Sequence, residues 1–167
     1  MPWWISASRH SCHSKYNYSM DNNYSFSNSL SFLITAAELY LKAELGRRLQ
    51  PFALTTEQWA VLNLLWETNG VTQKTLAVRS LKDQPNMTRI LRRLEQKGLL
   101  VRTGNSLDRR SFLISLTAKG QQTREATIDL ALDLRRQAFA GLDERECAEL
   151  GSLLTRINNN LLGMRGR

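Results

Sequence analysis

The chain has 167 residues, of which 42% are hydrophobic and 23% charged, and its net charge is +8. This length fits one domain with an appendage, and the hydrophobic share can supply a core. No apolar run approaches roughly 18 residues, and the start lacks a basic segment followed by a long apolar one, so neither a transmembrane helix nor a secretory signal is expected. The two cysteines, Cys12 and Cys147, make no disulfide framework, and we expect a protein of the reducing cytoplasm.

Residues 1–29 are polar and show no helical or strand period, so we expect a disordered tail. Met20 is a plausible second start, which would make the piece before it an extension of the gene model. His10, Cys12 and His13 have side chains that bind metals, but three ligands in such a tail with no fourth partner point to chance composition. We therefore expect no metal and no cofactor.

Apolar residues at helical spacing predict a first helix over residues 30–49, which must end before Pro51. A second helix begins after Thr55, because Thr55 and Gln58 have the spacing of a capping box, and Asn69 with Gly70 ends it. Thr72 is placed to cap a short third helix. The three elements are separated by turns of only a few residues.

Asp83 caps a fourth helix, in which Met87, Ile90, Leu91 and Leu94 form one apolar stripe. The period then changes to two, and residues 99–103 and 110–116 predict a β-hairpin. Two long helices follow, the second opening on a capping box. The fold class is therefore mainly α with a small β-hairpin: a winged helix-turn-helix followed by helices.

The surplus positive charge of the whole chain lies within residues 70–120, and the other residues are neutral in sum. A neutral scaffold with one basic module is the electrostatic pattern of a nucleic-acid binder, although charge alone also fits an anionic membrane surface. Eleven basic residues face three acidic ones in this segment. The basic ones are Lys74, Arg79, Lys82, Arg89, Arg92, Arg93, Lys97, Arg102, Arg109, Arg110 and Lys119.

On a helical wheel the side of the fourth helix opposite its apolar stripe is basic and polar. Arg, Asn and Gln are the side chains that read guanine and adenine edges in the major groove, whereas an ordinary solvated helix would serve equally well with Glu and Lys. This helix is therefore expected to recognise DNA. Pro85, Arg89, Arg92 and Gln96 point directly outward, flanked by Asn86, Thr88 and Arg93.

The predicted hairpin carries Asp108, Arg109 and Arg110 at its tip. An arginine at the tip of a wing can enter a narrow minor groove, whose negative potential attracts a guanidinium. Asp108 would then orient a neighbouring guanidinium. The alternative is an ordinary charged turn whose ion pair contributes well under about 1 kcal/mol.

These residues resemble the MarR family of winged helix-turn-helix repressors over about residues 30–162. The resemblance rests on Leu54-Thr55-x-x-Gln58-Trp59, Leu76-Ala77, Thr88-Arg89, Leu94-Glu95-x-Lys97-Gly98-Leu99, and Asp108-Arg109-Arg110 leading to Leu116-Thr117-x-x-Gly120. It implies a homodimer with dimerisation segments at 30–53 and 118–163 and a DNA-binding domain at 54–117. It also implies that Asp108 and Arg110 form the wing pair and that Thr88, Arg89 and Arg92 face DNA.

The resemblance further implies a repressor that a small aromatic effector releases from DNA. Tyr40, Trp59 and Trp66 could line the effector crevice, although aromatic residues at helical spacing are more often core. Peroxide-sensing members use a cysteine near the first helix. Residues 30–49 contain none, and Cys147 is placed to pack against Leu142, so redox sensing is disfavoured.

Two further expectations come from the residues themselves. The last two helices are apolar on more than one face, as Ile128, Leu132 and Phe139 illustrate, so a second copy should cover them and the operator should be palindromic. An enzyme is disfavoured, since both histidines lie in the tail and no phosphate loop or metal spacing is present. The competing hypothesis is a winged helix that contacts protein or RNA.

Overall fold

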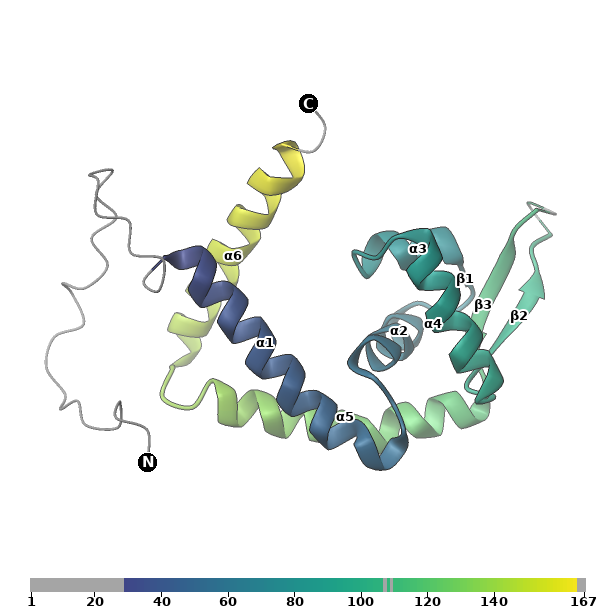
Figure 1. Cartoon of the computed structure of the whole chain (residues 1–167), viewed down its shortest axis with the longest axis horizontal. Helices are drawn as coiled ribbons and strands as arrows, with labels where there is room; N and C mark the ends of the chain where they lie inside the picture. The colour runs from purple at the N-terminus through teal and green to yellow at the C-terminus, as the bar shows by residue number, and fades with distance from the viewer. Residues whose placement is uncertain (1–28, 107, 109, 165–167) are drawn as a thin grey trace, which may run out of the picture. The chain divides into compact units, whose positions relative to one another are not determined.

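The computed structural model describes residues 29–106, 108 and 110–164, and the helices predominate as predicted. The tail, with Met20 and the His10, Cys12 and His13 cluster, lies outside the described residues. The chain divides into two units after Tyr40, inside the first helix, and the following account concerns the unit that begins at Leu41. The elements of Figure 1 are α1 (Leu30–Leu49), η2 (Gln50–Phe52), α2 (Thr56–Glu67), β1 (Val71–Thr72), α3 (Gln73–Arg79), α4 (Gln84–Gln96), β2 (Leu100–Gly104), β3 (Phe112–Leu116), α5 (Ala118–Ala138) and α6 (Glu144–Met164).

The helices begin at the caps predicted from the sequence. At α2 the hydroxyl of Thr55 accepts a hydrogen bond from the Gln58 amide (3.2 Å), and Oε1 of Gln58 accepts one from the Thr55 amide (3.4 Å). Asp143 and Glu146 make the corresponding pair of bonds at α6, at 2.8 and 2.9 Å. Each pair satisfies two amides that the first turn would leave without a partner. The predicted capping boxes are confirmed.

The predicted hairpin is confirmed as β2 and β3, which pair antiparallel from Leu100 opposite Leu116 to Gly104 opposite Phe112. The sheet also has a strand that the sequence did not reveal. Strand β1 pairs with β3 on its other side, and the strand order is β1-β3-β2. Two residues are too few to show a period of two, so only the pairing with β3 identifies β1 as a strand.

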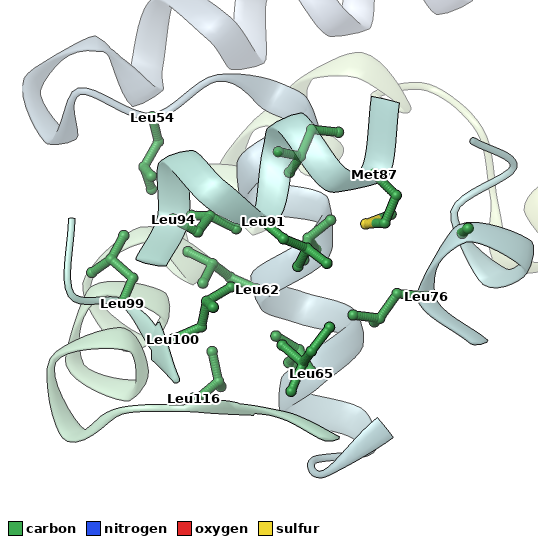
Figure 2. Packing of buried hydrophobic residues seen from close by; sticks show 14 of the residues in the cluster. Leu54, Leu62, Leu65, Leu76, Met87, Leu91, Leu94, Leu99, Leu100 and Leu116 are labelled. Carbon is green, nitrogen blue, oxygen red and sulfur yellow. The ribbon is translucent and has the colours of Figure 1, made fainter. Parts of the chain in front are cut away.

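One buried apolar cluster holds α2, α3, α4 and the sheet together, as Figure 2 shows. Its members include the whole predicted stripe of α4, which fixes the rotation of that helix and leaves the opposite side in solvent. Fully or nearly fully buried members are Leu49, Leu54, Val61, Leu62, Leu65, Leu76, Ala77, Met87, Ile90, Leu91, Leu94, Leu99, Leu100, Ile114 and Leu116.

The two C-terminal helices are covered to different extents. Helix α5 packs against α2, and its Thr127 is fully buried, where its hydroxyl accepts a hydrogen bond from Nε1 of Trp59 (3.1 Å). No residue of α6 is buried. The large apolar side chains that α6 exposes are Leu150, Leu153, Ile157, Leu161, Leu162 and Met164.

Candidate nucleic-acid interface

Helix α4 is positioned by its cap and by its buried stripe. Oδ1 of Asp83 accepts the amide of Asn86 at 2.7 Å, and Pro85 occupies the first turn, where its missing N–H costs nothing. The helix ends before Gly98, whose φ of +69° favours glycine. The predicted outward residues Pro85, Thr88, Arg89, Arg92, Arg93 and Gln96 are exposed, and Asn86 is half-buried.

The side of α4 nearest α2 forms a polar, basic pocket of about 330 Å³. Arg89, Arg93 and Lys82 line it together with Thr55 and Glu57 at the start of α2. Arg89 is exposed, and its Nη2 donates to Oδ1 of Asn86 at 2.7 Å. The basic surface therefore continues from the outer side of α4 toward the first turn of α2.

Lys97 joins α4 to the start of α2 at the other end of this side. Its Nζ donates to Oε1 of Gln58 at 3.0 Å and to the carbonyl oxygen of Ala53. Gln58 is almost completely buried, so the ammonium group of Lys97 supplies a hydrogen bond that the buried Oε1 of Gln58 needs. Of the cations counted in the basic segment, Lys97 is thus committed to structure rather than free for a ligand.

The side of α4 nearest α3 carries hydrogen bonds that the sequence did not indicate. Nε2 of Gln73 donates to the Thr88 hydroxyl at 2.7 Å and to Oε1 of Gln84 at 3.1 Å. Both glutamines directly follow the residue that caps their helix, and this shared position is the one feature of the sequence that could have pointed to them. Their proximity depends on the packing of α3 against α4, which sequence spacing alone does not give.

The wing is the hairpin of β2 and β3, which extends beside α4 in Figure 1. Arg102 on β2 lies across from α4, with its Nε 3.2 Å from Oε2 of Glu95. This pair neutralises the exposed carboxylate that α4 presents toward the wing. The basic character of the surface is therefore preserved where helix and wing meet.

The tip of the wing is held by Asp108. Its Oδ1 accepts the backbone amide of Arg110 at 3.0 Å, and its carbonyl oxygen accepts the Ser111 amide at 2.9 Å. The bond to Arg110 is thus to its main chain. Arg110 itself is exposed, and Arg109 lies outside the described residues. Asp108 shapes the turn that presents Arg110.

The three aromatic residues predicted for an effector crevice differ in their surroundings. Tyr40 belongs to the first unit and its side chain is 77% exposed. Trp59 is half-buried and bonded to Thr127, and it lines an open, mainly apolar pocket of about 290 Å³ on α2. The guanidinium carbon of Arg124 lies 4.4 Å from the ring centroid of Trp66, a cation–π contact. Both tryptophans therefore join α2 to α5.

The described part of the chain offers neither a metal site nor a membrane-spanning helix. Those residues contain no group of three or more His, Cys, Asp or Glu side chains placed to hold a metal ion. None of the helices drawn within them combines the length and apolar composition needed to cross a bilayer. Cys147, near the start of α6, is a half-buried free thiol.

Comparison with known proteins gives consistent matches. The MarR family model matches residues 54–112. An organic hydroperoxide resistance transcriptional regulator of Bacillus subtilis (strain 168) is 34% identical over 103 residues, covering 60% of this chain and 70% of that protein. A MarR variant of E. coli, solved with operator DNA, is 29% identical with a TM-score of 0.72, over 77% of this chain and 92% of its own.

A second solved relative is the S. aureus MepR–DNA complex. It is 27% identical to this chain with a TM-score of 0.75, and the match covers 82% of this chain and 99% of that one. The MarR family match falls on α2 through the start of β3, which is the segment that carries the basic helix and the wing. Both solved relatives are complexes with DNA, and this chain shares their fold.

Proposed function

The chain belongs to the MarR family of DNA-binding transcriptional regulators and is not an enzyme, and on this premise we propose a homodimeric repressor that binds palindromic operator DNA in the cytoplasm. The observation that carries the proposal is the outer side of α4, which exposes three arginines beside a wing that exposes Arg110. Such a helix fits the major groove, and such a wing fits the adjacent minor groove.

The homodimer is supported by the apolar surface of α6, none of whose residues is buried. An apolar surface of this kind is unfavourable in water and is usually covered by another subunit. A second copy related by a two-fold axis would place two α4 helices in successive major grooves, roughly 34 Å apart. The operator should then consist of two half-sites separated by about one helical turn.

Release by a small aromatic effector is supported by the contacts between α2 and α5. Trp59 and Trp66 link these helices, and a mainly apolar pocket lies beside Trp59. That pocket is also lined by Arg79, Ser80, Lys82 and Ile90, so a ligand that binds there would change how α2 meets α4 and the turn before it, and hence how the basic surface is held. The test is titration of the protein–operator complex with aromatic compounds, monitored by tryptophan fluorescence and DNA release, with a Trp59→Leu variant as the comparison.

The proposed roles of α4 and the wing can be tested separately with a randomised operator library at two salt concentrations. Arg110→Ala should weaken binding with little change in preferred sequence and should lower the salt dependence by about one unit per subunit. Arg89→Ala or Arg92→Ala should cost about 1–3 kcal/mol and relax the preference at one position of each half-site. Gln96, Arg93 and Asn86 can be ranked in the same assay.

The alternative is that this winged helix contacts protein or RNA rather than operator DNA. It makes the opposite prediction for the same variants. If wild type and all three variants bind the DNA library equally weakly and without preference, the basic surface serves another partner and the repressor proposal is wrong.

A further inference from the structure

Two glutamines outside the predicted recognition set meet where α3 and α4 come together. Gln73 is the first residue of α3 and Gln84 is the first residue of α4, and each follows the residue that caps its helix. Nε2 of Gln73 donates to Oε1 of Gln84 at 3.1 Å and to the hydroxyl of Thr88 at 2.7 Å. The Thr88 hydroxyl in turn donates to the carbonyl oxygen of Gln84 at 2.9 Å.

This arrangement fixes the orientation of the Gln84 amide. An exposed glutamine can ordinarily turn its carboxamide so that oxygen and nitrogen exchange places. The Thr88 hydroxyl gives its one proton to the Gln84 carbonyl, so Gln73 faces Thr88 with its NH₂ group, and a Gln84 nitrogen opposite that group would put two donors together. The Nε2 group of Gln84 therefore points away from Gln73, and among the described residues it has no hydrogen-bond partner. Its Oε1 keeps a second lone pair, since a carbonyl oxygen has two.

The location of Gln84 matches the part of a recognition helix that reads DNA. In helix-turn-helix proteins the N-terminal residues of the second helix contact base edges in the major groove. Gln84 is exposed and immediately precedes the outward Pro85, and Thr88 follows one turn later. An oriented donor and acceptor at this point match one base in particular, because a glutamine amide forms two hydrogen bonds with adenine.

We propose that Gln84 reads an adenine in each half-site and that Gln73 is the positioning residue that holds Gln84 in the reading orientation. Nε2 of Gln84 donates to adenine N7, and its Oε1 accepts from the N6 amino group while still bonded to Gln73. The inference rests on the proposed DNA interface and adds a specificity-determining residue to it. A purely structural tie between α3 and α4 would not need an oriented, unoccupied Nε2 group, and the buried Leu76 and Leu91 already pack those helices together.

The experiment uses the full chain and an operator selected by wild type from a random library. Each adenine in turn is replaced by 7-deazaadenine, which lacks N7, or by purine, which lacks the amino group. One adenine per half-site should show a penalty of roughly five- to one-hundred-fold with both analogues for wild type, the range of one two-bond contact. Gln84→Met should remove the penalty at that position and keep every other one. Gln122→Met, at an exposed position of α5, is the matched control and should behave as wild type.

The positioning role has its own readout. Gln73→Met should reduce the same penalty, and it should have no further effect on that penalty in the Gln84→Met background, because it acts through Gln84. A penalty that persists at every adenine in Gln84→Met overturns the inference. A lower thermal unfolding midpoint in Gln73→Met with an unchanged analogue penalty assigns Gln73 a structural role only and overturns its positioning role. If wild type selects no sequence, the DNA-binding proposal itself has failed, which is a separate result.

Discussion

Leu81, in the turn between α3 and α4, adopts a backbone conformation that suits glycine better. Its φ is +55° and its side chain is 82% exposed, so no packing compensates for the conformation. The turn is held by backbone bonds around it, including Lys82 N–H to the Ala77 carbonyl at 2.9 Å. A left-handed conformation costs a non-glycine residue about 1–2 kcal/mol. The turn of the helix-turn-helix thus carries local strain at a position open to solvent.

Replacing this residue should therefore stabilise the protein. Leu81→Gly should raise the free energy of unfolding by about 1 kcal/mol, after some loss to the greater freedom of glycine in the unfolded chain. Leu81→Ala removes the exposed apolar side chain but keeps the strain, and it should have little effect. Urea denaturation of the three proteins checks this. Equal stability of the glycine and alanine variants would show that the conformation is not the cause.

Asp108 offers a second test at the scale of one residue. Because Oδ1 of Asp108 accepts the Arg110 amide, Asp108→Asn should keep the turn and bind DNA at least as tightly, since a negative charge is removed from a surface that meets phosphates. Asp108→Ala should lose the bond and weaken DNA binding. Affinities measured by fluorescence anisotropy at one salt concentration distinguish the two. If both variants weaken binding equally, the carboxylate charge matters and the backbone bond does not.

At the scale of elements, α5 begins against Leu99, between α4 and β2. A Cβ atom added to the buried Gly120 would lie 2.0 Å from the carbonyl oxygen of Leu99, far inside van der Waals contact. The same carbonyl accepts the Thr117 amide at 3.2 Å. The start of α5 therefore approaches the end of α4 and the wing as closely as backbone atoms allow, and only glycine fits at that point.

Gly120→Ala should force α5 away from Leu99 and cost about 1–3 kcal/mol or more, the range for overpacking a tight site. Gly46→Ala, inside α1, is the matched control, because the added Cβ would lie at an ordinary 3.8 Å from the side chain of Thr56. That variant should be unchanged or more stable by up to about 1 kcal/mol, since alanine favours helix. Thermal unfolding of both checks this. Equal midpoints for the two would contradict the close approach.

How far the sequence predicts these elements depends on the range of the interaction. The caps at Thr55 and Asp143 and the α4 stripe depend on residues spaced three or four apart in the chain, and all were predicted. The sequence missed three interactions between residues farther apart in the chain. They are the pairing of β1 with β3, the Gln73–Gln84 bond and the Lys97–Gln58 bond. The outward residues of α4 follow from the helical period, whereas the direction of Arg89 depends on Asn86 and the pocket beside it.

At the scale of the molecule, Arg48 joins the end of α1 to α5. Its guanidinium donates to Oδ2 of Asp133 at 2.8 Å, to the carbonyl oxygen of Leu130 at 3.2 Å and to Gln137 at 2.9 Å. Its Nε also donates to Glu44 at 2.8 Å. With Arg47, it lowers the pKa of Glu44 from 4.5 to about 2. Arg136 and then Arg48 lower the pKa of Asp133.

The sign of the pH dependence follows from these shifts. Carboxyl groups with a lowered pKa in the folded state add stability above pH 4.5, and that stability is lost as the pH falls toward 2. Arg48→Met should lower the thermal midpoint at pH 7 and make its decline over this pH range shallower. Arg47→Met, which removes only the bonds to Glu44, should change the midpoint less. Identical acid profiles for wild type and Arg48→Met would contradict this account.

The exposed apolar side of α6 gives a test of assembly. Leu153→Glu should shift the protein toward monomer in sedimentation velocity at micromolar concentration, because a carboxylate would be buried in the proposed interface. Asn159 lies opposite the apolar side of α6 by the 3.6-residue period of the helix. Asn159→Glu should therefore leave the dimer intact. A wild-type protein that sediments only as a monomer would contradict the homodimer.

The residues of the buried cluster are all made before the C-terminal helices during synthesis, because they run from Leu49 to Leu116 in the chain. Every member of that cluster is thus synthesised before α6, and domains fold as units, N-terminal parts first. The helix-turn-helix and its wing can therefore assemble on a nascent chain. Helix α6, with none of its residues buried in one copy, has no such core to join, and in the proposed homodimer it would pair only with a second chain. In the proposed homodimer, synthesis would thus separate the folding of the basic surface from the pairing of two chains.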